Sequence, residues 1–168
     1  MFRKLLLMGK PGLLLILHMN RGNMFNIAND TNQINFNISD IRDFSVSGDL
    51  CSEYDKSIYF NVELVLENGF FNVLDCQFYY FELEELIEGL LSVLRKTRDE
   101  YLFSDERNIV NISFKRDGDS ENFSVCYKLF EYFDSDCYIT GSFIISGENL
   151  CDIINNIKPY LEEKRVSG

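Results

Sequence analysis

The fold is decided by residues 56–98, which read KSIYFNVELVLENGFFNVLDCQFYYFELEELIEGLLSVLRKTR. Apolar residues recur at every second position over 56–66, and Tyr59, Asn61 and Glu63 fall on the opposite face. This alternation predicts an antiparallel strand with one buried face, because successive side chains point to opposite sides of a strand. Asn68-Gly69 follows, and this dipeptide between two alternating runs predicts a β-hairpin whose turn residues adopt positive φ.

The return strand and the helix after it complete this unit. Over 70–80 the apolar phase switches, which predicts a β-bulge near residues 72–74. A helix is predicted over 82–98, because apolar residues recur there at helical spacing. Its acids come first and its basic residues last, which complements the helix dipole. The side chains expected to face water are Glu82, Glu85, Glu88 and Ser92.

The second half of the sequence shows a similar plan. Alternating segments at 110–114, 123–129 and 139–145 predict three strands, and Asp117-Gly118 predicts a turn between the first two. Ser146 is expected to cap a helix over about 148–164. Pro159 lies inside this helix and is expected to kink or shorten it, because proline removes one helical hydrogen bond.

These elements predict an α+β fold: an antiparallel meander sheet with two helices packed on one face. Alternation at 34–38 predicts a strand before residue 56, and a further apolar segment runs over 40–48. Shifting the first helix by 67 positions superimposes its apolar stripe on that of the second. A duplicated βββα unit would give this match, and so would two unrelated amphipathic helices. Both interpretations stay open.

Residues 1–23 differ from the rest of the chain. They contain four of the 16 basic residues and no acid, so residues 24–168 hold 12 basic and 27 acidic residues, a net charge of −15 against −11 overall. Three interpretations are open: translation beginning at Met24, which we favour, a tail outside the fold, and a signal peptide. A transmembrane helix is excluded, because the apolar stretches are shorter than the ~20 residues needed. We expect a single domain over 24–168.

The residues give no support for an enzyme. The one histidine, His18, lies in the atypical segment, so a nucleophile with a histidine base is not expected. Phosphate-binding glycine motifs and zinc-ligand spacings are absent, and no cofactor or metal ion is implied. An odd number of cysteines, five, without a C-x-x-C pair predicts reduced thiols and a cytoplasmic protein. Cys76 and Cys126 are expected to be buried in strands.

One stretch stands out as a candidate binding surface. Residues 127–138 read YKLFEYFDSDCY, combining large aromatic and acidic side chains. If the alternating residues over 123–129 face the core, Phe130 and Tyr132 fall on the outer face of the sheet. Exposed aromatics beside acids favour a protein-binding site with charge steering. The alternative is that a helix or the N-terminal segment covers them. The candidate partner-binding residues are Phe130, Glu131, Tyr132, Asp134 and Asp136.

The order of elements over about 25–164 resembles the WapI family of bacterial immunity proteins. The similarity rests on CQFYYF at 76–81, on the helix ELEELIEGLLSVL and on the segment GSFIISGENLCDIINNIKPYL. Proteins of this family neutralise toxins of contact-dependent or polymorphic toxin systems, many of which are basic nucleases. The resemblance therefore implies a basic protein toxin as partner, and it supplies no binding residue at a defined position.

We therefore expect an acidic cytoplasmic immunity protein that binds and neutralises a toxin. An acidic surface repels phosphate, so direct binding to nucleic acid or to an anionic membrane is not expected. Two alternatives stay open. A deep apolar pocket would favour a small ligand-binding or structural domain. A cleft that gathers two or more acids with raised pKa values would favour a carboxylate-based hydrolase.

Overall fold

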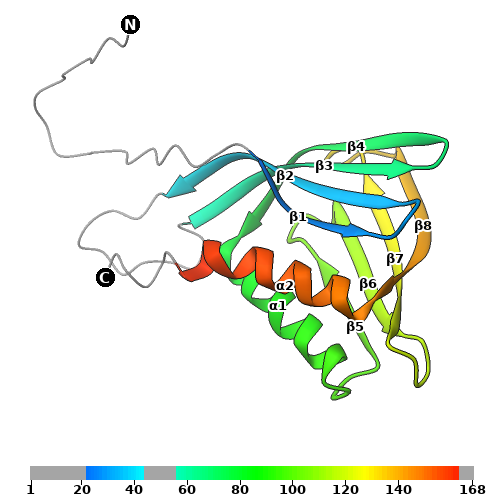
Figure 1. Ribbon diagram of the computed structural model, residues 1–168. Coiled ribbons are helices and arrows are strands. Elements are labelled where there is room, and N and C mark those ends of the chain that lie inside the picture. Colours follow the sequence, from blue (N-terminus) through cyan, green and yellow to red (C-terminus); the bar gives the residue numbers. More distant parts are fainter. Residues whose placement is uncertain (1–21, 44–55, 163–168) are drawn as a thin grey trace, which may run out of the picture.

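The computed structural model describes residues 22–43 and 56–162 (Figure 1). The predicted segment over 40–48 therefore lies largely outside the described residues, as does the atypical segment up to residue 21. The elements are β1 (Asn23–Ala28), β2 (Gln33–Asp43), β3 (Lys56–Leu66), β4 (Gly69–Tyr79), α1 (Tyr80–Leu94), β5 (Glu100–Ser104), β6 (Val110–Arg116), β7 (Asn122–Phe130), β8 (Tyr138–Ser146) and α2 (Gly147–Glu162).

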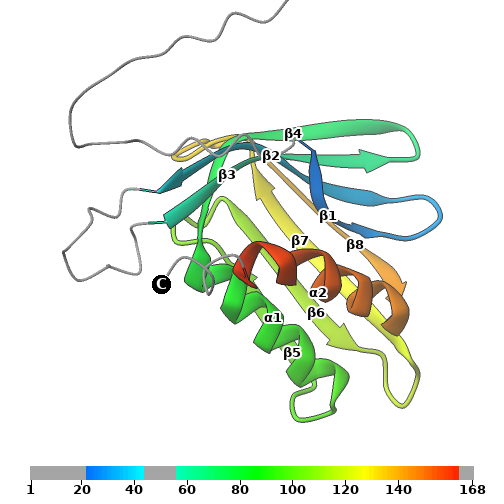
Figure 2. The same ribbon diagram turned by 60° about the vertical axis from the view of Figure 1, so that its left-hand side comes forward.

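The predicted α+β fold is confirmed: antiparallel meanders are combined with two helices. The strands are divided between two sheets, with the orders β1-β2-β3-β4 and β5-β6-β7-β8. Figures 1 and 2 show the sheets splaying apart, with both helices lying in the space between them. Each half of the chain is thus a ββββα unit, one strand longer than the predicted βββα repeat. The strands that the sequence patterns missed are β1 and β5.

The helices are exchanged between the halves. α1 packs more extensively against β5 than against β4, and α2 packs more extensively against β1 than against β8. Four of the buried apolar positions of α1 lie 67 residues before the four buried positions of α2, as the superposition of stripes predicted. These pairs are Leu83 and Leu150, Leu86 and Ile153, Ile87 and Ile154, and Leu90 and Ile157.

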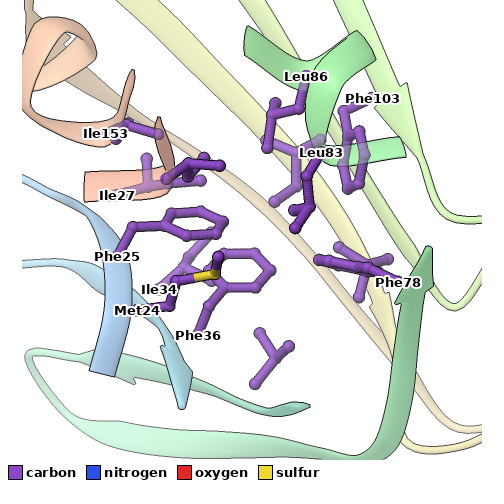
Figure 3. Close-up of a cluster of buried hydrophobic side chains, with 14 of the residues drawn as sticks. Met24, Phe25, Ile27, Ile34, Phe36, Phe78, Leu83, Leu86, Phe103 and Ile153 are labelled. Atoms are coloured by element: carbon purple, nitrogen blue, oxygen red, sulfur yellow. The ribbon is translucent and has the colours of Figure 1, made fainter. Parts of the chain in front are cut away.

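The core between the sheets is dominated by phenylalanine. Phe25 and Phe36 stack with ring centroids 4.2 Å apart, and Phe60 lies 4.9 Å from Phe78. Phe78 also meets Phe103 of the second sheet edge to face at 5.2 Å, and Figure 3 shows this pair beside Leu83 of α1. Aromatic pairs in such geometries stabilise by about 0.5–1.5 kcal/mol beyond their area of burial. The phenylalanines therefore join both sheets and the first helix.

The helix boundaries can be compared with those predicted. α1 begins two residues earlier and ends four residues earlier than predicted, so the basic residues Arg95 and Lys96 lie just beyond its end and its last turn holds none. Ser146 caps α2 as predicted: the N–H of Asn149 donates to its Oγ at 3.3 Å, and its own N–H donates to Asn149 Oδ1 at 3.1 Å. α2 continues through Pro159 to Glu162. The carbonyl that Pro159 leaves without a helical donor belongs to Asn155, an exposed residue.

Some local predictions need correction. In the β3–β4 hairpin Leu66 pairs with Gly69, so Glu67 and Asn68 form the turn. Neither Asn68 nor Gly69 has positive φ, so the predicted turn geometry is wrong. The predicted bulge is present slightly later, because Leu74 and Asp75 together oppose Asn61.

Two predictions of burial were also wrong. Cys76 is buried as predicted, whereas Cys126 is exposed on the outer face of β7. Glu82 is buried with 4% of its surface exposed, although it was expected to face water. Within the described ranges, no helix is long and apolar enough to cross a membrane.

Substituting Phe78 tests its place at the junction of the sheets. Phe78→Ala is expected to lower the free energy of unfolding by about 3–5 kcal/mol, because it leaves a cavity between three elements. Phe70→Ala is the matched control: Phe70 lies in the same strand with 73% of its surface exposed, and its loss should cost less than about 0.5 kcal/mol. Urea unfolding followed by circular dichroism measures both. Equal losses would contradict the assignment.

Candidate protein-binding site

The candidate residues lie at the end of β7 and in the connection to β8. This connection is held by its own hydrogen bonds: the N–H of Glu131 donates to the carbonyl of Cys137 at 3.0 Å, and the N–H of Ser135 to that of Tyr132 at 3.2 Å. The N–H of Cys137 donates to Ser135 Oγ at 3.0 Å. Asp134 adopts φ of 64°, a left-handed conformation that Asp tolerates better than most residues. The sequence therefore folds residues 131–137 into a defined turn.

Large aromatic side chains gather on this turn and beside it. Tyr132, Phe133 and Tyr138 have 55%, 56% and 54% of their surfaces exposed. Phe130 pairs with Tyr138 across the strands, with ring centroids 5.4 Å apart. Lys128 Nζ lies 4.7 Å from the first of these two rings and 4.6 Å from the second, a cation–π arrangement. We call residues 130–138 the 130–138 surface.

A recess of about 230 Å³ lies within the 130–138 surface. Four of the five predicted residues line it: Phe130, Tyr132, Asp134 and Asp136. The fifth, Glu131, is exposed beside it, and its carbonyl accepts a hydrogen bond from the Leu74 N–H of β4 at 3.2 Å. The structure therefore brings the predicted residues together and links their turn to the first sheet.

The charge of the 130–138 surface is acidic and uncompensated. Glu131, Asp134 and Asp136 are exposed, and none of them forms an ion pair with another residue of the described ranges. Lys128 is the neighbouring cation, and its ammonium lies over the aromatic rings. Three free carboxylates around exposed rings can bind cationic side chains while the rings provide apolar contact area.

The other wall of the recess comes from the β5–β6 loop, which the sequence patterns did not select. Asn108 and Ile109 line the recess, and Asn108 adopts φ of 56°. Buried acids hold this loop in place. Glu82 of α1 accepts the N–H of Tyr79 through Oε2 and the N–H of Glu106 through Oε1, both at 2.7 Å. Asp105 Oδ1 accepts the N–H of Val110, also at 2.7 Å.

Burial perturbs the acidity of these groups. Burial raises the pKa of Glu82 to about 7, and the charges of Asp105 and Glu106 contribute to this rise. The hydrogen bonds that Glu82 accepts from the N–H groups of Tyr79 and Glu106 lower its pKa and offset part of the effect. Burial also raises the pKa of Asp105, and it raises the thiol pKa of neighbouring Cys76 well above its ordinary value. Neither Glu82 nor Asp105 lines the recess in the 130–138 surface. Their hydrogen bonds to the backbone support a positioning role.

The raised pKa of Glu82 predicts a pH-dependent stability. The folded protein binds this proton more tightly than the unfolded chain. The contribution of protonated Glu82 to the free energy of unfolding is therefore fully present below about pH 4.5 and is lost as pH rises through 7. Between those limits we expect a loss of about 1–3 kcal/mol. In Glu82→Gln this component disappears. Urea unfolding of both proteins from pH 4.5 to 8 measures the difference.

Glu88→Gln is the control for this experiment. Glu88 lies on the same helix but is exposed, so its loss should leave the pH dependence unchanged. If Glu82→Gln kept the pH slope of the unaltered protein, the raised pKa would be wrong.

The described residues contain no group of three or more His, Cys, Asp or Glu side chains that could hold a metal ion. What the 130–138 surface offers is apolar area, hydrogen-bonding groups and negative charge around a shallow recess, the composition of a protein-binding site. No protein-family model, curated protein or solved structure matches the chain.

Proposed function

We propose that this protein is an acidic interaction protein whose 130–138 surface binds a basic protein. The observation that carries the proposal is the gathering of three rings that are each more than half exposed, Tyr132, Phe133 and Tyr138. The first two of these rings line a recess together with Asp134 and Asp136. Aromatic side chains at the centre of an interface commonly dominate the binding energy. Large exposed rings grouped in this way favour a partner surface over solvent.

The net charge supports a basic partner. The chain carries −11 overall, so a positively charged protein would be attracted over a long range and oriented toward the acidic side chains. Glu131, Asp134 and Asp136 are not neutralised by ion pairs in the described part of the chain. Cations of the partner can therefore pair with them without displacing an existing contact.

We further propose that the partner is a toxin and that binding neutralises it. The resemblance to WapI-family immunity proteins supports this class of partner. Where the toxin is a nuclease, carboxylates at the 130–138 surface would occupy the basic groups that otherwise hold phosphate. Inhibition then needs no catalysis by the immunity protein, because the bound partner is blocked.

Co-expression tests the toxin proposal directly. If a gene for a secreted protein with a variable C-terminal toxin domain lies beside the gene for this protein, co-expression should allow cells to survive that toxin. Tyr132→Ala together with Phe133→Ala should weaken binding to the toxin by at least about tenfold and reduce survival. Phe70→Ala removes a ring of the other sheet that is still more exposed, and it should change neither. Failure of the unaltered protein to rescue cells would dispose of the immunity role.

The acidic side chains should act mainly on the rate of association. Asp134→Asn with Asp136→Asn is expected to slow binding to the toxin by about three- to tenfold at low salt, with little change in dissociation, because long-range steering is lost. Asp30→Asn with Glu67→Gln removes the same charge from turns of the first sheet and should have a smaller effect. Surface plasmon resonance at two ionic strengths measures the rates. Association independent of both salt and the first pair of substitutions would contradict steering.

A further inference from the structure

The edge of the second sheet that β5 forms differs from two of the other sheet edges. Two other sheet edges are joined to the opposite half of the molecule: Leu74 of β4 donates its N–H to Glu131, and Asn29 Nδ2 donates to the carbonyl of Ile144 in β8 at 3.1 Å. β5 pairs only with β6 and ends the second sheet. A recess of about 650 Å³ lies between this edge strand and α1. Figure 2 shows α1 and β5 side by side.

The register shows which backbone groups of β5 face the recess. Asp105 donates its N–H to Val110, and Asp99 accepts that of Arg116, so the odd-numbered residues of β5 share the hydrogen bonds with β6. Hydrogen-bonding groups alternate sides along an antiparallel strand. The N–H and C=O of Leu102 therefore point away from β6, toward the open edge. Leu102 has 62% of its surface exposed and lines the recess.

α1 forms the opposite wall. Its residues Glu85, Glu88, Gly89 and Ser92 line the recess, and their spacing places them on one face of the helix. The ring of Tyr101 lies directly against Gly89, where a Cβ atom would collide with it. Because Gly89 lacks a side chain, the ring can pack against the helix, and it forms part of the lining of the groove between α1 and β5. An edge strand beside a helix is the geometry in which domains bind an extended peptide as an added strand.

The charges of the groove favour basic side chains. Glu85 and Glu88 are exposed, and neither forms an ion pair within the described ranges. Arg98 also lines the recess, so its charged lining residues are two acids and one base, a net charge of −1. Their Cβ atoms are roughly 5–6 Å apart as helix neighbours at i and i+3. Alternate side chains of an extended segment are about 7 Å apart on one face. Two basic residues separated by one position could therefore reach both carboxylates.

We propose that the groove between α1 and β5 binds an extended segment of a partner protein as a fifth strand of the second sheet. The segment carries Lys or Arg at two alternating positions, which face Glu85 and Glu88, while its backbone pairs with Leu102. A second copy of β5 fits poorly, because its sequence EYLFS has no basic residue and would bring acidic grooves together. The groove shares no lining residue with the 130–138 surface. The proposal is therefore independent of the toxin hypothesis.

A designed peptide tests the groove with the full-length protein. The probe is the acetylated and amidated peptide GTKVKVTG, and its control is the peptide GKKTVVTG, which has the same composition without alternation. Titration into ¹⁵N-labelled protein should shift the amide signal of Leu102 and protect it from exchange, and the control peptide should bind more weakly. Absence of a Leu102 response to the first peptide would overturn the proposal.

Two variants separate the backbone from the charges. Leu102→Pro removes the outward N–H while leaving the hydrogen bonds to β6 intact, and it should abolish binding. Glu85→Gln with Glu88→Gln should weaken binding by roughly three- to tenfold, whereas Asp30→Asn with Glu67→Gln should not. Unchanged binding by Leu102→Pro, with a native circular dichroism spectrum, would overturn strand addition. If Leu102→Pro did not fold, the unaltered protein would provide the test. Nuclear Overhauser effects between the Leu102 amide proton and the bound peptide would support strand addition, and their absence would overturn it.

Self-association is the competing outcome. Analytical ultracentrifugation of the unaltered protein should give a monomer at the concentrations used for peptide binding. The opposite result would be a dimer that becomes stronger in the Glu85→Gln and Glu88→Gln variant and that the peptide cannot dissociate. Such a dimer would show that the edge pairs with a second copy. That result would also overturn the proposal.

Discussion

The edge-to-face contact between Phe78 and Phe103 joins two sheets that share no strand. Phe78 stands near the end of β4 and Phe103 near the end of β5, so α1 and the short connection after it must fit between these two points. Once the rings are fixed, Glu82 in the first turn of α1 lies within reach of the loop that follows β5. Through Glu82, the position of Asn108 and Ile109 at the recess therefore depends on the core contact between Phe78 and Phe103.

The buried acids lower the stability of the fold but fix the position of the backbone that they bind. A carboxylate in the interior is costly, and the raised pKa of Glu82 is the sign of that cost. In return, one side chain holds backbone groups of α1 and of the β5–β6 loop together. An apolar residue at position 82 would avoid the penalty but would leave two backbone N–H groups without acceptors. Glu82 is thus a structural part of the candidate site without touching its recess.

Sequence patterns predicted the longer elements because their periodicity extends over many residues. β3, β6, β7, β8 and both helices follow from alternation or from an apolar stripe, and the 67-residue offset of the stripes relates four buried residues of α1 to the four of α2. β1 was missed because the adjacent residues Met24 and Phe25 are both buried, so its pattern does not alternate, and β5 was missed because Phe103 is the one buried residue among its five. Phe130, Tyr132, Asp134 and Asp136 were predictable as neighbours in one turn. Their companion loop was not, because it is brought there by tertiary contacts alone.

The exchange of helices between the halves has a consequence for the order of synthesis. β1 is made first, and α2, which packs against it, is made last. About 120 residues separate the end of β1 from the start of α2, or roughly 6–24 s of translation at ~5–20 residues per second. During this interval the apolar face of the first sheet lacks part of its cover on the ribosome. The cover of the first sheet is therefore completed only after the final helix has been made.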